Sequence, residues 1–482
     1  MPPSTRGARE RLSVPWAASS RPLPRTVVQP INRFLHMEVA AGVLLLIAAV
    51  AALIWANSPA REAYTALFET EVAVEVGGHV LGHTVREWIN DLFMSLFFFV
   101  VGLEIKREIV HGDLRDPKQV ALPVVAALGG MIVPALLFLS FNAGTPAATG
   151  WGVPMATDIA FAVGVLALVG RRAPTSLKIF LLTLAIADDI GAIIVIAVFY
   201  TSGIELQWLG AAAIGLGVTA VMKRVGIRAF MPYAAVAGFL WFAVLESGVH
   251  ATVAGVALGL LTPSRPFHDP AAVAHAVTDP LEGVLALRDD AEMDGQRMLE
   301  VSRLAYEGVS PLARLEATLH GWSSFVILPL FALANAGVTL ADGAFGAALR
   351  SPVALGVVAG LVLGKPIGIL LFSWLAVRLK VAELPASSGW LEILGVGLLA
   401  GIGFTVALFV TNLAFADAVT EDAAKVGILA ASTIAGLLGA GFLAVRGVPT
   451  TDPASESAAL RGGTERVEAP ATGRGFDEGP VG

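Results

Sequence analysis

Long apolar stretches recur along this 482-residue chain and constrain its fold more than any other feature. A helix that crosses a lipid bilayer needs about 20 mostly apolar residues. Runs of that length are too long for barrel strands, so they predict an all-α polytopic membrane protein. Twelve segments fit this description: residues 37–57, 88–109, 119–141, 150–170, 176–200, 206–222, 229–246, 248–262, 320–338, 353–377, 391–413 and 424–445.

The composition excludes several other classes of protein. Charged residues make up 15% of the chain, whereas soluble domains carry about 25%. This deficit argues against an ordinary soluble enzyme and against a disordered protein. The net charge of −7 argues against a nucleic-acid partner, because a DNA-binding face needs an excess of basic residues. The chain has no cysteine, which excludes disulfides, thiolate nucleophiles and cysteine metal sites, and we expect no cofactor.

Basic residues predict the orientation in the membrane, because Lys and Arg collect in cytoplasmic loops. They cluster in residues 1–36 and in the loops after the second, fourth, sixth and tenth predicted spans. The intervening loops contain only Arg61, Arg86, Arg350 and Lys425. Both termini are therefore expected in the cytoplasm, which requires an even number of spans.

Several segments are expected to lie outside the bilayer that residues 37–446 cross. Residues 1–36 and 447–482 have the composition of disordered cytoplasmic tails. Residues 263–319 are predicted to form a charged cytoplasmic loop, with helical potential over 281–307. Residues 70–85 alternate around two glycines and predict an external hairpin.

Four ionisable residues lie deep inside predicted spans: Asp158, Asp188, Asp189 and Lys365. Each costs roughly 2.5–3.5 kcal/mol at a helix centre unless it is paired or hydrated. Lys365 is the only Lys or Arg that we assign to the interior of a span, and one of the adjacent aspartates is available as its counter-charge. The structural alternatives are a salt bridge without a transport role, and two solvated aspartates at a misplaced span end.

Two predicted spans have a composition that disfavours a continuous helix. Two glycines and Pro154 shortly precede Asp158 in the fourth span, and Gly401 and Gly403 interrupt the eleventh. A broken span exposes backbone groups at membrane depth, which is tolerated only beside a cavity. The structural alternative is that Asp158 or its neighbour Thr157 only caps the second half-helix.

The positions of the two breaks predict an internal repeat. Spans three to five contain one broken helix, and spans ten to twelve contain the other. Corresponding helices are seven spans apart, so the two triplets run in opposite senses. Interrupted helices in an inverted-topology repeat indicate a transport site at the repeat interface.

The sequence around these charges resembles the NhaA family of sodium/proton antiporters over roughly residues 33–446. Several stretches match in order: residues 102–108 (GLEIKRE), 156–161 (ATDIAF), 184–193 (LAIADDIGAI), 248–255 (GVHATVAG), 333–338 (LANAGV), 364–368 (GKPIG) and 401–405 (GIGFT).

The resemblance implies roles for the buried charges. The fourth and eleventh helices would be interrupted and would cross each other. Asp189 matches the main cation-binding carboxylate, and Asp188 its neighbour, which pairs with Lys365. Asp158 and Thr157 match the interrupted fourth helix, where Asp158 would offset the positive ends of the half-helices and Lys365 the negative ends.

The resemblance also implies regulatory and assembly features. The positions tied to pH response near the cytoplasmic side are Glu104, Lys106, Arg107, Glu108 and His250. Asp91 matches an acidic residue towards the external end of the second helix, and the hairpin at 70–85 would join two subunits in a homodimer. The plainer alternatives are a solvated helix end for Glu104 and Glu108, an interfacial histidine for His250, and a helix N-cap for Asp91.

These features predict an ion antiporter of the cell membrane rather than an enzyme. The expected reaction exchanges cytoplasmic Na+, or Li+, for external H+ by competition for the mid-membrane aspartates. It would respond to pH and move net charge. One rival is a sodium-coupled symporter of an organic solute, which needs a larger polar pocket. The other is an intramembrane aspartyl protease, which needs two aspartates on separate helices, one of them in a Gly-x-Gly-Asp setting.

Overall fold

The computed structural model describes residues 39–446, apart from residues 77–78, 116, 170–174, 202, 228, 277–290, 340–343 and 386–387. Helices make up most of this part, and its two strands form one small sheet. The segments predicted as tails, 1–36 and 447–482, lie outside the described residues.

The elements in chain order are α3 (Ala40–Ala56), α4 (Arg61–Phe68), β1 (Glu71–Val76), β2 (His79–Thr84), α5 (Val85–Trp88), η3 (Ile89–Phe93), α6 (Met94–His111), η4 (Asp113–Arg115), α7 (Pro117–Asn142), η5 (Pro146–Met155), α8 (Ile159–Val169), α9 (Thr175–Phe199), α10 (Leu206–Val225), α11 (Phe230–Glu246), α12 (Thr252–Leu261), α14 (Ala291–Glu307), α15 (Pro311–Trp322), η7 (Ser323–Ile327), α16 (Leu328–Asn335), α17 (Ala344–Arg350), α18 (Pro352–Val358), η8 (Ala359–Gly364), α19 (Lys365–Arg378), α20 (Trp390–Ala400), α21 (Phe404–Ala414) and α22 (Ala418–Arg446).

Every predicted span coincides with a helix or a bent pair of helices, although not all are long enough to cross a membrane alone. Seven helices in the described part have the length and apolar composition of a membrane span. The fourth and eleventh segments are bent pairs. The first, seventh and eighth correspond to α3, α11 and α12, which have 17, 17 and 10 residues. The chain is thus a helical protein with multiple spans, and the count of twelve stays a prediction.

The two interruptions predicted from glycine and proline are present. η5 and α8 meet at an angle of 45°, and α20 and α21 meet at 50°. Each break leaves backbone N–H and C=O groups without helical partners. These groups are available to neighbouring side chains at the centre of the molecule.

Three of the long helices contain a π-helical segment, which the sequence analysis did not predict. These segments are η3 before α6, η7 before α16 and η8 before α19. η8 ends directly before Lys365, and Pro366 follows. Because proline has no backbone N–H to donate, it favours a local departure from α-helical hydrogen bonding. π-Helical turns of this kind are frequent at functional sites.

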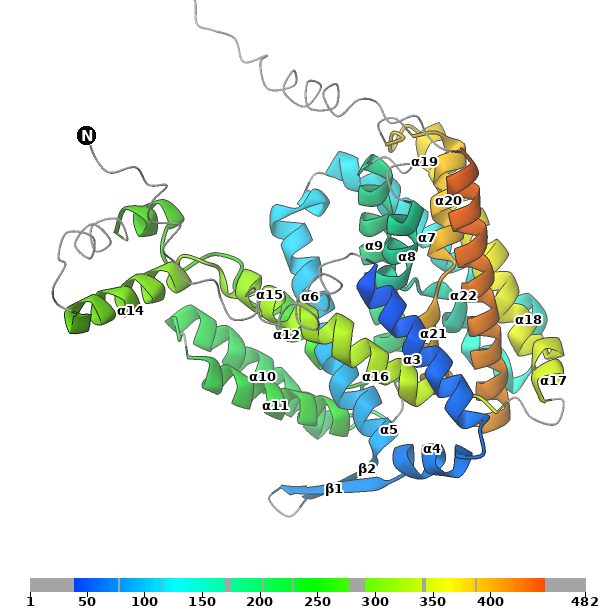
Figure 1. Cartoon of the computed structure of the whole chain (residues 1–482), viewed down its shortest axis with the longest axis horizontal. Helices are drawn as coiled ribbons and strands as arrows, with labels where there is room; N and C mark the ends of the chain where they lie inside the picture. The colour runs from blue at the N-terminus through cyan, green and yellow to red at the C-terminus, as the bar shows by residue number, and fades with distance from the viewer. Residues whose placement is uncertain are drawn as a thin grey trace, which may run out of the picture.

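The alternating segment before the second span forms the predicted hairpin. β1 pairs antiparallel with β2, from Glu71 opposite Thr84 to Val76 opposite His79. Figure 1 shows this ribbon and α4 together at the lower edge of the helices. The Trp88 indole N–H donates to the Val72 carbonyl at 2.9 Å and holds the ribbon against the start of the second span.

The predicted loop at 263–319 contains more helix than expected. α14 occupies Ala291–Glu307, and α15 starts at Pro311, nine residues before the predicted start of the ninth span at 320. Ser310 caps α15 through the Ala313 N–H at 3.2 Å, and Pro311 occupies its first turn. Serine followed by proline is a strong helix start. Figure 1 shows α14 projecting away from the other helices.

Close backbone contacts define two pairs of helices. A Cβ on Gly102 of α6 would lie 2.9 Å from the Val256 carbonyl oxygen of α12, and one on Gly259 would lie 2.7 Å from the Phe99 carbonyl oxygen. A Cβ on Gly129 of α7 would collide with the Gly368 carbonyl of α19. Only glycine allows such approaches. The second pair fixes α19, which carries Lys365, beside α7.

Candidate functional site

The two helix breaks lie directly against each other. The Asp158 backbone N–H, at the first break, donates to the Ile402 carbonyl at the second, with an N···O distance of 2.7 Å. The Thr157 hydroxyl lies 3.0 Å from the carbonyl of Ala400, the last residue of α20. Two segments that are about 240 residues apart in sequence thus satisfy each other's freed backbone groups.

The Asp158 carboxylate caps both half-helices that start at these breaks. Its Oδ1 accepts from the Phe161 N–H of α8 at 2.9 Å. Its Oδ2 accepts from the N–H and the hydroxyl of Thr405 in α21, at 3.1 and 2.7 Å. One negative charge therefore faces the positive ends of two helices, a favourable arrangement. The capping role that the sequence allowed as an alternative is present, and it extends to a second helix.

Lys365 and Asp188 form an ion pair that is closed to solvent. The Lys365 ammonium donates to Asp188 Oδ2 and, at 2.8 Å, to the Thr157 hydroxyl. Both charged side chains are fully buried. Separating such a pair leaves an uncompensated charge, which is strongly destabilising. The aspartate that pairs with Lys365 is thus the one that the resemblance implied.

Thr157 connects the ion pair to the second helix break. Its hydroxyl oxygen lies 2.6 Å from Asp188 Oδ2, as well as 3.0 Å from the Ala400 carbonyl. A hydroxyl has one proton to donate, so it serves one of these acceptors at a time while it accepts from Lys365. The residue is completely buried.

Asp189 differs from its two acidic neighbours because its carboxylate has no partner in the described part of the chain. No hydrogen bond or ion pair reaches it there, although the residue is only 3% exposed. Asp188 Oδ1 is likewise buried without a hydrogen-bond partner among the described residues. Buried polar atoms normally have partners, so these oxygens are positioned to receive a cation or a proton.

Apolar side chains close to Asp189 in the sequence pack between α9 and α6. Ile186, Ile190 and Ile193 lie three residues before, one after and four after it, and they pack with Val101 and Ile105 of α6. The contact between α6 and α9 is therefore apolar next to Asp189 along the chain.

Charged residues at the C-terminal end of α6 pair with α15. Arg107 contacts Glu316, and its Nη2 lies 3.0 Å from Glu108 Oε1. His320 Nδ1 lies 3.3 Å from Glu104 Oε1. The Glu108 and Glu316 side chains are only 13% and 14% exposed, so this is not simply a solvated helix end. Lys106 lies on the same turn of α6.

His250 does not belong to that cluster, although the resemblance grouped it with these residues near the cytoplasmic side. Its Nε2 lies 3.9 Å from Asp91 Oδ1, and its ring packs edge-on against Phe409. Asp91 precedes Glu104 by 13 residues, which corresponds to about 20 Å along a helix. The sequence match identifies His250 as a residue of interest, but it does not show which end of α6 the side chain faces.

The N-cap alternative for Asp91 is also wrong. The cap of this helix is Thr84, which forms a capping box with Glu87. Asp91 lies inside η3, where its carbonyl accepts from the Trp241 indole at 3.2 Å.

Three residues with charged partners in the structure were not predicted from the sequence: Glu316, His320 and Lys425. Glu316 and His320 lie in or beside the segment interpreted as a loop. Lys425, assigned to the sparsely charged loops, is a second buried lysine: it is 2% exposed in α22 and lies 2.6 Å from Glu421 Oε1. The i,i+4 spacing of these two residues in an apolar helix is the signal that could have identified the pair.

Comparison with known proteins gives consistent matches over almost the whole described part. Residues 32–443 match the family model described as Na+/H+ antiporter 1. A Na+/H+ antiporter NhaA of Rhodopirellula baltica is 47% identical, over 86% of this chain and 94% of that protein. NhaA 2 of Sorangium cellulosum is also 47% identical, over 88% and 91%. A solved structure of the sodium proton antiporter MjNhaP1 from Methanocaldococcus jannaschii aligns at 16% identity with a TM-score of 0.43, covering 87% of this chain and 100% of that one.

Proposed function

The chain belongs to the Na+/H+ antiporter 1 family, and from this premise we propose that it exchanges cytoplasmic Na+, or Li+, for external H+ at Asp189. The family and its named members support sodium/proton exchange by a multi-pass protein of the plasma membrane. The ion site, the direction of exchange and the regulation are our proposal.

The unpartnered carboxylate of Asp189 is the observation that carries this proposal. Asp158 is engaged by two helix ends, and Asp188 by Lys365 and Thr157. Asp189 alone of the three has a carboxylate with no protein partner in the described part of the chain. A buried carboxylate has to be neutralised, so a mobile cation or a proton can fill that role.

Competition between Na+ and H+ then produces exchange. Sodium is a hard cation that suits oxygen ligands. Asp189 provides the first ligand, with the free Oδ1 of Asp188 beside it, and Asp158 and Thr157 contribute negative potential and dipoles from the adjoining break. Binding of one ion excludes the other. An empty, charged site is costly inside the bilayer, so the site reorients only when it is loaded.

The charge balance of the site supports electrogenic exchange. Three carboxylates and one ammonium carry a net charge of −2 when all are ionised. Exchange of two protons for one sodium ion moves one net charge. The first proton binds at Asp189, and the second is held either by Asp188 or by Lys365 and is released when sodium binds. Each charge moved across the membrane gains about 2.3 kcal/mol per 100 mV, so an inside-negative potential drives sodium outward.

Regulation by pH belongs, in this proposal, to the cluster shared by α6 and α15. Glu104, Glu108 and Glu316 lie next to Arg107 and His320 there. Histidine changes charge closest to neutral pH. Titration of this cluster alters the contact between the two helices and thereby the access to Asp189. We also propose that both termini lie in the cytoplasm and that the β1–β2 ribbon joins two subunits.

The two rival functions have less support. A symporter of an organic solute needs polar groups that orient the solute, whereas the polar side chains at the helix breaks already bond to one another and to backbone groups. An aspartyl protease needs two aspartates facing one water. Asp188 and Asp189 are adjacent on one helix, and the oxygens of Asp158 already accept hydrogen bonds from two helix ends.

The direct test is sodium-triggered collapse of a pH gradient in proteoliposomes. We expect Asp189→Asn to abolish the response, because the amide can neither bind a proton nor offer a charged ligand. The matched control is Asp417→Asn, at the exposed start of α22, where the side chain only accepts from Thr420. Exchange retained by Asp189→Asn would overturn the assigned site. Sodium uptake that requires an organic co-solute would overturn antiport.

A further inference from the structure

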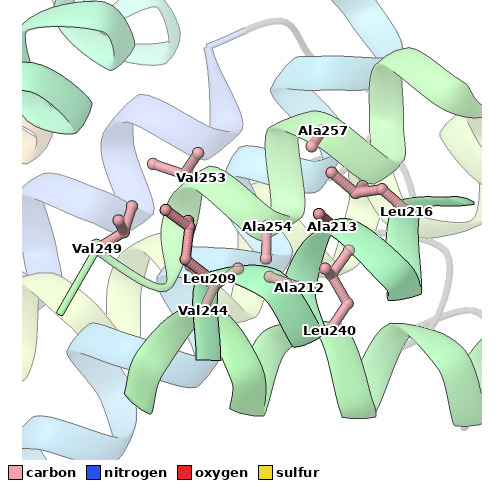
Figure 2. Close-up of a pocket in the computed structure, with 10 residues that line it drawn as sticks. All are labelled: Leu209, Ala212, Ala213, Leu216, Leu240, Val244, Val249, Val253, Ala254 and Ala257. Atoms are coloured by element: carbon pink, nitrogen blue, oxygen red, sulfur yellow. The ribbon is translucent and has the colours of Figure 1, made fainter. Parts of the chain in front are cut away.

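An apolar pocket of about 190 Å³ lies between α10, α11 and α12, away from the aspartates. Figure 2 shows side chains from all three helices around it. Ten residues line it, and all are leucine, alanine or valine. No polar side chain is available in this lining to hold water or an ion.

The pocket exists because small residues face each other where the helices meet. Ala212 of α10 and Ala254 of α12 are buried there together with Leu240 and Val244 of α11. These side chains form a small core that is separate from the main one. Larger residues at the alanine positions would close the space, so its volume is set by the sequence.

We assign the protein surface around this pocket to the hydrocarbon of the bilayer. α10 qualifies as a membrane span, yet only 22% of its most apolar window is buried inside the protein. Ile214 and Val221 on the same helix are 66% and 60% exposed. An apolar cavity of about 150 Å³ excludes water and admits small apolar molecules. An empty cavity forfeits packing contacts.

From these observations we propose that the pocket is a binding site for one acyl chain of a membrane phospholipid. The chain enters from the bilayer and packs against Leu209, Leu216 and Val253. The acyl chain fills the space that the small alanine side chains leave between α10, α11 and α12. Membrane lipid fits better than a water-soluble ligand, because the lining offers no polar group.

The position of the pocket links it to His250, which lies beside Asp91 at the start of the second span. Val249 and Val253 line the pocket and flank His250 in the sequence. His250 faces Asp91 and Phe409. A bound chain therefore supports the segment that holds His250 in place. The binding site itself does not depend on the proposed exchange mechanism.

Native mass spectrometry of the full-length protein, released from defined phospholipid vesicles, tests the proposal. We expect Ala213→Phe and Ala257→Phe, whose new rings fill the pocket, to retain one phospholipid fewer per subunit than the unmodified protein. Ala220→Phe adds the same ring to α10 at an exposed position outside the pocket lining and is expected to retain the full number. Equal lipid numbers for all four proteins would overturn the proposal.

A second measurement needs no substitution and covers the case in which the filled variants do not fold. Phospholipids with a photoactivatable group in the middle of the acyl chain are reconstituted with the unmodified protein and illuminated. We expect labelling of α10 to concentrate at pocket residues such as Leu209 and Leu216, at least several-fold above Ile214 and Val221. Labelling spread evenly over these four positions would show only the general lipid belt and would contradict a defined site.

Discussion

Three aspartates of the same intrinsic chemistry have different surroundings at the centre of this molecule. Asp158 is fully engaged in capping two helices. Asp188 uses one oxygen for Lys365 and Thr157 and leaves the other free. Asp189 has a carboxylate without partners in the described part of the chain. By the hydrogen bonds that they accept, Asp158 is structural and Asp188 is paired, and we propose that Asp189 accepts the ion.

The Thr157 hydroxyl provides a residue-level prediction. Thr157→Val keeps the shape but removes a hydrogen bond to each member of the Lys365–Asp188 pair. Hydrogen bonds to charged groups contribute about 1.5–3 kcal/mol, so we expect a loss of stability of that order and weaker exchange. Thr183→Val is the matched control, because Thr183 bonds only to the Ile179 carbonyl of its own helix, at 2.9 Å. Thermal unfolding in detergent and proteoliposome exchange give the two readouts. Equal behaviour of the two variants would contradict this role.

The sequence alone was informative about these residues for a physical reason. Lipid penalises an unpaired charge so strongly that Asp158, Asp188, Asp189 and Lys365 are conspicuous in any apolar run. Their surroundings are not, because Thr405, which bonds to Asp158, and Ala400, which bonds to Thr157, reach the site only through the folding of the second break. Lys425 escaped notice for the opposite reason, since it lies near the start of a span, where a charge appears permissible.

At the scale of helices, the contact between α7 and α19 determines where Lys365 lies. A Cβ on Gly129 would meet the Gly368 carbonyl and the Phe372 ring. We expect Gly129→Ala to destabilise the protein by about 1–3 kcal/mol through overpacking. Gly217→Ala is the control: its new methyl group would meet no neighbour within 4 Å, and replacing glycine in a helix gains up to about 1 kcal/mol. If the melting temperatures of both variants shift in the same direction, this packing argument is refuted.

Helix positions were predictable because length and apolarity determine them, whereas local departures were not. The breaks at Pro154 and Gly401 have a clear composition. The start of α15 was missed because Arg314, Glu316 and His320 give its first turns the appearance of a loop. The π-helical segments have no comparable sequence signature. Only the structure shows that η8 ends directly before Lys365.

For the whole molecule, the unequal charge of the proton-loaded and sodium-loaded sites leads to a prediction about membrane potential. If one net charge moves per cycle, 100 mV contributes about 2.3 kcal/mol, or about fifty-fold in the sodium gradient at equilibrium. We expect a potassium-diffusion potential, negative on the side that sodium leaves, to accelerate exchange. Lowering the pH on that side at constant sodium is expected to slow exchange, because protons occupy Asp189. An exchange rate that does not change with the membrane potential would show that exchange is electroneutral.

Assembly gives a second prediction at this scale. The β1–β2 ribbon is attached to its own subunit through Trp88 and the start of the second span, and we propose that it joins two subunits. Replacing residues 71–84 with a short glycine linker is expected to convert a dimer into a monomer, measured by light scattering with correction for detergent. The control is Gly82→Ala, because the added Cβ would meet nothing within 4 Å. This variant is expected to stay dimeric. A dimer that survives the deletion would exclude the ribbon as the main contact.

The relation between distant clusters was the least predictable feature of the whole molecule. The resemblance placed His250 with Glu104, whereas the structure places it beside Asp91. A sequence match transfers identity, but neither the packing of α12 along α6 nor the direction in which a side chain points. That information resides in the contacts of Gly102 and Gly259, which are invisible in composition.

The glycine contacts of α6 with α12 have a mechanical consequence. Because backbone touches backbone, with no flexible side chain between, the two helices form a stiff rod. One end of the rod carries Asp91 and His250, and the other carries Glu104 and Arg107. In our proposal of pH regulation, a tilt that titration causes at one end of this helix pair therefore has to move the other end as well.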